Sequence, residues 1–181
     1  MRFYREITLA DGEVIVLRSL EKQDAGAAIF CLRQTSGETE FLLREVSECG
    51  MTIAQEEEVI KRKNDEKRGM LLGVFAGDAL IGMAGLNACG AFERVRHRAS
   101  IGISLLRAYW GRGIGTAMMH ALIDAAKDAG YEQIELDVVE ENKRALALYQ
   151  RLGFKVAGHM PRAMKYRDGR YAALTLMVLS L

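Results

Sequence analysis

The sequence predicts a single domain of the α/β class spanning residues 1–181, in which strands and helices alternate. The chain is long enough for a sizeable core, and half of its residues are hydrophobic. Segments with the patterns of strands and helices follow one another, and no linker separates them. The expected strands cover residues 14–18, 70–76, 79–87, 97–106, 133–139, 155–159 and 172–180. The expected helices cover residues 24–34, 52–68, 116–129 and 142–152.

Local signals mark the elements of the first half of the chain. After the short apolar strand at 14–18, Asp24 is a candidate N-cap for the first helix. Thr52 and Gln55 fit a capping box, so a charged helix is expected to begin there. The pair Gly77-Asp78 joins two apolar runs and predicts a hairpin, although Asp-Gly would suit a primed turn better.

In the second half, glycines mark the ends of helices. Gly130 and Gly153 follow helical patterns and predict left-handed C-terminal caps. Between them, residues 133–139 alternate apolar side chains with Glu135 and Asp137, which is typical of a strand with one buried face. These signals predict a strand between two helices.

Composition excludes several classes of function. The net charge of +1 gives no sign of nonspecific nucleic-acid binding. No apolar run approaches the roughly 20 residues needed to cross a bilayer, so no membrane association is expected. The charged N-terminus lacks a signal-peptide core, which predicts a cytoplasmic protein. Cys31, Cys49 and Cys89 are too few and too scattered for a disulfide framework or a metal site.

The most informative segment is a glycine-rich loop between an apolar strand and a helical pattern. Glycines stand at positions 111, 113 and 115, and Arg112 lies among them. Glycine lets a backbone approach a phosphate closely, and the N–H groups and dipole of a helix start attract an anion. Arg112 would add a full positive charge. The loop therefore predicts a phosphorylated ligand, although a lone Gly-x-Gly is also typical of an ordinary surface turn.

Two common phosphate-binding motifs do not fit this loop. A dinucleotide fingerprint requires G-x-G-x-x-G, whereas these glycines fall at alternate positions. A P-loop requires a Gly-Lys pair, and the chain contains none.

A third motif fits. Residues 110–115, WGRGIG, resemble the pyrophosphate loop Gln/Arg-x-x-Gly-x-Gly/Ala of the GNAT superfamily of N-acetyltransferases, with Trp110 departing at the first position. The family's second motif has matches at Leu136, Val138, Asn142, Ala145, Tyr149, Gly153 and Phe154. The resemblance covers essentially the whole chain and is close to the branch that acetylates ribosomal proteins and small amines. It implies a mixed, mostly antiparallel sheet of about seven strands, flanked by helices and splayed where coenzyme A binds.

The resemblance also implies the site. The backbone from Gly111 to Thr116, including Ile114 and Gly115, would hold the pyrophosphate of acetyl-CoA, with Arg112 and Gly113 in the same loop. Ile103 and Leu105 would offer backbone groups to pantetheine. Asn142 and Ala145 would lie along the cofactor. Tyr149 would face its sulfur and act as the catalytic acid, because a phenol remains a proton donor at neutral pH.

The general base is left open. Many relatives carry Glu where this chain has Ser100, and serine is a poor base. His97, Glu135 and Asp137 are alternatives, the carboxylates acting through water.

Acceptor-binding groups are expected in the N-terminal half. Glu38, Glu40 and Glu45 could attract a cationic amine, although such a charge run is typical of a solvated surface. The basic loop 162–170 could admit an acidic group or form an exposed hairpin.

The expected function is acetyl transfer from acetyl-CoA to a primary amine of a small molecule or peptide N-terminus, by direct attack. The alternative is a noncatalytic acyl-CoA-binding module. No metal is expected, and a homodimer is a possible state that no segment specifies.

Overall fold

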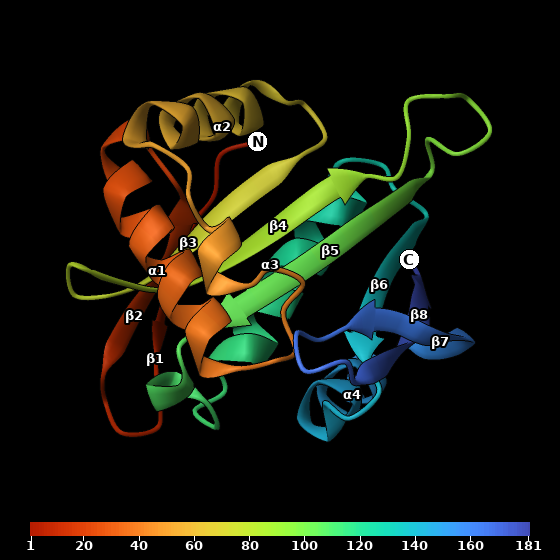
Figure 1. Cartoon of the computed structure of the whole chain (residues 1–181). Coiled ribbons are helices and arrows are strands. Elements are labelled where there is room, and N and C mark those ends of the chain that lie inside the picture. The colour runs from red at the N-terminus through yellow and green to blue at the C-terminus, as the bar shows by residue number, and fades with distance from the viewer.

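The computed structural model describes residues 1–181 and has eight strands and four α-helices (Figure 1). The strands are β1 Tyr4–Thr8, β2 Val14–Ser19, β3 Met70–Ala76, β4 Ala79–Ala88, β5 Arg98–Leu105, β6 Gln133–Val139, β7 Lys155–Lys165 and β8 Tyr171–Ser180. The helices are α1 Ala25–Glu38, α2 Ile53–Asp65, α3 Ile114–Asp128 and α4 Lys143–Arg151. Short 3-10 helices span Lys22–Asp24, Val46–Glu48 and Arg107–Tyr109.

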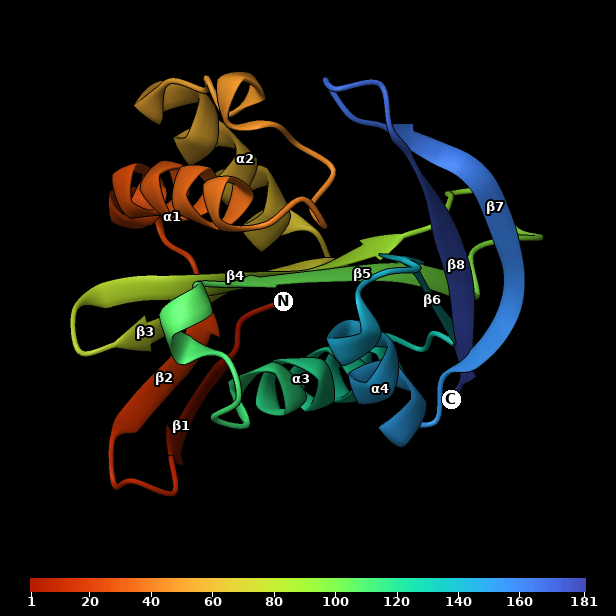
Figure 2. The same ribbon diagram turned by 60° about the horizontal axis from the view of Figure 1, so that its bottom comes forward.

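All eight strands form one sheet in the order β1-β2-β3-β4-β5-β6-β8-β7. Every neighbouring pair is antiparallel except β5 and β6. The predicted mixed, mostly antiparallel sheet with flanking helices is therefore confirmed. Figure 2 shows α1 and α2 on one face of the sheet and α3 and α4 on the other, with β6, β8 and β7 turning away from the rest.

Two apolar cores lie on the two faces of the sheet. The larger is built on α3, where Ile114, Met118 and Leu122 recur every four residues and are fully buried. Burying each such side chain stabilises the fold by about 1.5–3 kcal/mol. The smaller core packs residues of α1 and α2, including Cys31 and Ile60, against β3 and β4. Both helical layers are thus fixed to the sheet beside β5.

The largest differences between the structure and the sequence prediction are at three places. It adds β1, an edge strand whose side chains are nearly all exposed and which therefore has no alternating pattern to detect. β7 continues past the predicted end at His159 to Lys165, because its outer edge needs no hydrogen bond from Pro161. The first helix continues to Glu38, four residues past its predicted end.

None of the four helices combines the length and the apolar character needed to cross a membrane.

Candidate functional site

The sheet opens between its two parallel strands. β5 and β6 share register only at Arg98–Ser100 and Gln133–Glu135, and beyond these residues the strands diverge. A cavity of about 970 Å³ occupies the opening and is lined by the C-terminal half of β5, by β6, by the start of α3 and by α4. Five residues from the end of α1 and the loop after it line the cavity from the other face of the sheet: Thr35, Thr39, Phe41, Leu42 and Leu43. The cavity therefore reaches both faces.

The glycine-rich loop borders the cavity at the start of α3. Gly111 and Gly113 have φ of 83° and 84°, a left-handed conformation in which a side chain would be strained. None of the backbone N–H groups of residues 111–116 donates a hydrogen bond to a protein acceptor. The side chain of Ile114 is buried in the core and anchors the helix start, whereas Gly115 and Thr116 line the cavity. Six consecutive free donors and a helix dipole make this loop an anion-binding surface.

Arg112 does not line this cavity. Its guanidinium forms ion pairs with Asp11 and Glu13, in the turn between β1 and β2. The cation at the loop is Arg144 of α4, which lines the cavity. Its guanidinium stacks 5.2 Å from the ring of Trp110, and its Nη2 lies 3.3 Å from the position that a Cβ on Gly111 would occupy.

Trp110 explains the departure from the family motif. Its Nε1 donates a hydrogen bond of 2.7 Å to the carbonyl oxygen of Leu105, at the end of β5. The ring thus ties the loop back to the strand and offers a face to Arg144. Ile103 and Leu105 both line the cavity on this strand.

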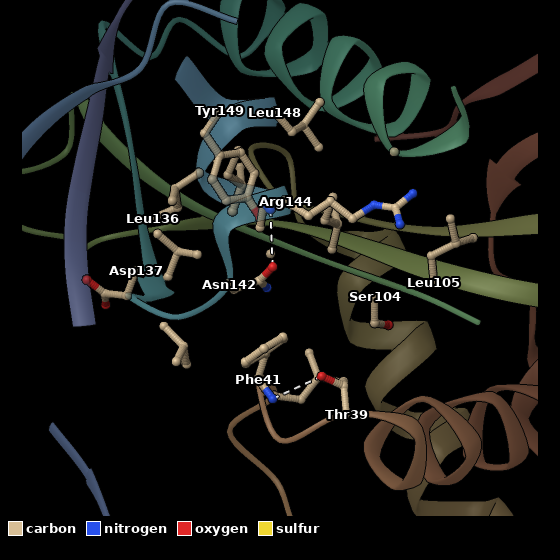
Figure 3. Close-up of a pocket in the computed structure, with 18 of the residues that line it drawn as sticks. Thr39, Phe41, Ser104, Leu105, Leu136, Asp137, Asn142, Arg144, Leu148 and Tyr149 are labelled. Carbon is tan, nitrogen blue, oxygen red and sulfur yellow. Dashed lines mark hydrogen bonds between the residues drawn. The ribbon is translucent and has the colours of Figure 1, made fainter. Parts of the chain in front are cut away.

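The start of α4 forms the next part of the wall (Figure 3). Asn142 is its N-cap, and its Oδ1 accepts a 3.1 Å hydrogen bond from the N–H of Ala145. Ala145, Leu148 and Tyr149 continue along the same wall. Asn142, Ala145 and Tyr149 therefore all border the cavity.

Tyr149 is the most deeply buried of these side chains, with 8% of its surface exposed. Its ring packs on Phe154 with a centroid distance of 5.9 Å. Its hydroxyl forms no hydrogen bond within the protein. The hydroxyl oxygen is not sealed off inside the protein, so it keeps access to the cavity. Burial raises the pKa of Tyr149 to about 12, so the hydroxyl stays protonated at neutral pH.

The four candidate bases are in different environments. His97 lies outside the cavity, whereas Ser100, Glu135 and Asp137 line it. Two hydrogen bonds from Arg98 hold the pKa of Glu135 below its usual value, which makes that carboxylate a weak base. Asp137 is exposed, and its carboxylate forms no ion pair or hydrogen bond within the protein.

The charged groups expected to bind the acceptor instead bind the protein itself. Glu38 accepts a 2.6 Å hydrogen bond from the N–H of Arg107, which fixes the end of β5 to α1. In the loop between β7 and β8, Arg170 pairs with Glu40 at 2.9 Å, and Arg167 lies 3.8 Å from Glu45. Two carboxylates of the acidic run, Glu40 and Glu45, thus pair with the basic loop in a clasp between residues 40–47 and 166–170.

Sequence reasoning missed two parts of the cavity. Arg144 lies far from the glycine loop in sequence, and only the packing of α4 beside α3 brings it there. The apolar side chains Phe41, Leu42 and Leu43 also line the cavity, and Leu43 is 84% exposed. An apolar run directly after a helix was the only sequence signal for them.

Comparison with known proteins places this arrangement in a family. The sequence profile of the acetyltransferase (GNAT) family matches residues 38–154, more than half of the chain. The L-amino acid N-acyltransferase MnaT of Escherichia coli is 31% identical over 100 residues, covering 55% of this chain and 58% of that protein. The N-alpha-acetyltransferase RimI of Mycobacterium tuberculosis is 37% identical over 90 residues, 48% of this chain and 52% of that protein. The chain thus spans little more than half the length of these curated relatives.

Solved structures extend the similarity of fold to nearly the whole chain. A GNAT-family acetyltransferase from Streptococcus pneumoniae superposes with a TM-score of 0.88 at 24% identity, over 92% of this chain and 99% of that one. The Salmonella typhimurium protein yncA, solved with its cofactor acetyl-CoA, superposes with a TM-score of 0.80 at 20% identity, over 92% and 94%. The family predicted from the sequence is confirmed: the chain belongs to the acetyltransferase (GNAT) family, whose acyl donor is acetyl-CoA.

Proposed function

We propose that this chain transfers the acetyl group of acetyl-CoA to a primary amine by direct attack within a ternary complex. The observation that carries the proposal is the run of six free N–H donors at residues 111–116, beside a cavity that reaches both faces of the sheet. The donor can enter from the face of α3 and α4, and the amine from the face of α1. Holding two reactants in line in this way supplies up to about 7–11 kcal/mol of the barrier.

The pyrophosphate would be held by the backbone of residues 111–116. Arg144, rather than Arg112, would add the positive charge, because its guanidinium lies at the loop while that of Arg112 is paired elsewhere. Beyond the shared register, the edge of β5 at Ile103 and Leu105 has no partner strand, and the amides of pantetheine can bond there as an added strand would. The carbonyl oxygen of Leu105 already accepts one hydrogen bond, from Trp110 Nε1. The small side chain of Ala145 leaves space beside this path.

Tyr149 would act on the sulfur. As the amine nitrogen attacks the carbonyl carbon, the carbon–sulfur bond breaks and negative charge develops on sulfur. Because the pKa of Tyr149 is about 12, above the value of about 8.5 for a thiol, early proton transfer is unfavourable. The hydroxyl would therefore donate a hydrogen bond to the developing thiolate and pass its proton to sulfur only as the bond breaks. The phenolate left behind, being the stronger base, would regain a proton from solvent at neutral pH.

The attacking amine also has to lose a proton. We propose Asp137 as the acceptor, directly or through one water, because its carboxylate is free while that of Glu135 is engaged by Arg98. The names of the relatives support a nitrogen acceptor, since one is an L-amino acid N-acyltransferase and the other an N-alpha-acetyltransferase.

A thiol-release assay tests the proposal. The purified chain is mixed with acetyl-CoA and, in separate reactions, with polyamines, amino acids, amino acid amides, aminoglycosides and short peptides. We expect release of free thiol with at least one amine, together with acetylated product by mass spectrometry. Tight binding of acetyl-CoA without thiol release across the whole panel would support the noncatalytic acyl-CoA-binding module instead.

A further inference from the structure

The acceptor side of the cavity has a definite chemical character. Side chains directly opposite each other on paired strands point to the same face of a sheet. Met83 packs against the core under α1 and pairs in register with Ser104, so Ser104 faces α1. Ser100 is four residues before Ser104 on the same strand, so it faces α1 as well. Its register partner on β6, Glu135, points to the same face. Asp137, two residues further along β6, and its register partner Leu176 therefore also lie on this face. We call this set, Ser100, Ser104, Glu135, Asp137 and Leu176, the acceptor floor.

The acceptor floor carries one uncompensated charge, and that charge is negative. The carboxylate of Glu135 is neutralised by Arg98, whereas Asp137 has no cationic partner. Two hydroxyls that line the cavity from α1 and the loop after it already form hydrogen bonds with backbone groups. Thr35 Oγ1 donates to the carbonyl of Cys31, and Thr39 Oγ1 accepts from the N–H of Phe41.

No cationic side chain forms an ion pair with Asp137, and Arg98, which lies on the same face, is paired with Glu135. The cationic residues lining the cavity are Lys143, Arg144 and Arg151. All three belong to α4, on the opposite face of the sheet from α1 (Figure 2). Arg167 and Arg170 of the clasp are paired with carboxylates.

The walls above the acceptor floor are apolar. Phe41, Leu42 and Leu43 line the cavity after α1, and Leu176 adds an apolar side chain to the floor itself. Figure 3 shows Phe41 and Thr39 on the side of the cavity away from Tyr149 and Leu148. These walls suit an apolar substituent, while the free carboxylate suits an ammonium group.

We propose that the acceptor is a primary amine with an apolar substituent and without a carboxylate on the carbon that bears the nitrogen. This inference rests on the proposed acetyl transfer. A free α-amino acid would bring its own carboxylate within two bonds of the amine, next to Asp137 and with no cation to receive it. The N-terminus of a peptide and a simple alkylamine share the required chemistry, because neither carries that charge.

Matched acceptors separate this proposal from the proposed function. The assay measures kcat/KM for thiol release with L-leucine, L-leucinamide, 3-methylbutylamine and a tripeptide amide that begins with leucine, and repeats the set for alanine and phenylalanine side chains. Each value is expressed per concentration of unprotonated amine, because the carboxylate and amide change the pKa of the amine. We expect the uncharged acceptors to exceed the free amino acid by at least about tenfold. The ratio of peptide to alkylamine then distinguishes the two sources.

A charge introduced into the acceptor floor gives a second measurement. Ser104→Arg places a cation on the floor and should raise the use of leucine relative to leucinamide. Ser180→Arg, the same change at an exposed position outside the cavity, should leave the ratio unaltered. Equal or better use of free amino acids by the wild type, or an unchanged ratio in Ser104→Arg, would overturn the proposal. Absence of thiol release with every amine would instead refute acetyl transfer itself.

Discussion

Replacing Tyr149 by phenylalanine is the sharpest test of the chemistry. The change removes one hydroxyl that has no protein hydrogen-bond partner. It keeps the aromatic ring that packs on Phe154 at a centroid distance of 5.9 Å. The fold should therefore be retained, and the free energy of unfolding should change little, because no buried polar partner is left unsatisfied.

The effect on turnover follows from the environment of the hydroxyl. A positioned acid contributes about 10²–10⁴-fold to a rate. With a pKa of about 12, Tyr149 is a poor match for a thiolate, so the lower end of that range applies. We expect kcat to fall by about 10²-fold, which corresponds to about 2.7 kcal/mol in the activation free energy. The Kd for acetyl-CoA should stay nearly constant.

The assay combines thiol release, to obtain kcat, with calorimetric titration of acetyl-CoA and thermal unfolding as controls. Wild-type kcat should also show no loss below pH 10 that is attributable to Tyr149, because its pKa is about 12. An unaltered kcat in Tyr149→Phe would remove this residue from the acid role. A loss of kcat matched by a similar loss of acetyl-CoA affinity would make it a packing residue.

Three further predictions concern the loop and the cavity. Arg144→Ala should weaken acetyl-CoA binding about tenfold, whereas the Kd of Arg112→Ala should stay within about twofold of the wild type, because only Arg144 lines the cavity. Calorimetry at low and high salt measures both Kd values. Gly113→Val should cost about 1–2 kcal/mol of stability and abolish acetyl-CoA binding. A Cβ at this position meets no atom within 4 Å, but the φ of 84° is strained for valine. Thermal unfolding measures the loss of stability, and calorimetric titration measures the loss of binding. The Arg98 hydrogen bonds lower the pKa of Glu135 in the folded state, so their stabilisation is present above the unfolded pKa of about 4.3 and lost as the pH falls through the folded value. Urea unfolding at several pH values should therefore show Glu135→Gln less stable than wild type at pH 7, with the difference shrinking below about pH 4.

Each of these predictions can fail separately. Equal losses of affinity in Arg144→Ala and Arg112→Ala would mean that the loop rearranges around the ligand. Binding of acetyl-CoA by Gly113→Val would show that the loop is misassigned. A constant difference between Glu135→Gln and wild type from pH 7 to pH 3 would contradict the stabilising role of the Arg98 pair.

The sequence predicts those parts of the fold whose signals are local. The alternation at Glu135 and Asp137 predicts the observed bounds of β6, because one face of this strand is buried. The capping box at Thr52 also marks the observed helix start. Edge strands lack such a pattern, and β1, whose side chains are almost all exposed, could not be found in this way.

The site was predictable where a motif is continuous and not where it depends on packing. The glycine positions, Asn142 and Tyr149 all border the cavity. The place of Arg112 in the loop predicts a contact with the ligand, but its partners Asp11 and Glu13 lie about a hundred residues earlier in the chain. Only the folded arrangement of β1 and β2 beside α3 reveals that pairing.

Where β5 and β6 diverge, each strand has an unpaired edge inside the protein. An unpaired strand edge normally pairs readily with a strand from another molecule, which promotes aggregation. Here the two unpaired edges face each other across the interior of the protein. A single extended chain can therefore fit between them, whereas a folded protein cannot. Alternate amide protons of both strands, those directed into the opening, should consequently exchange with deuterium faster than the protons that point to β4 and β8, and binding a chain of that shape should slow them selectively.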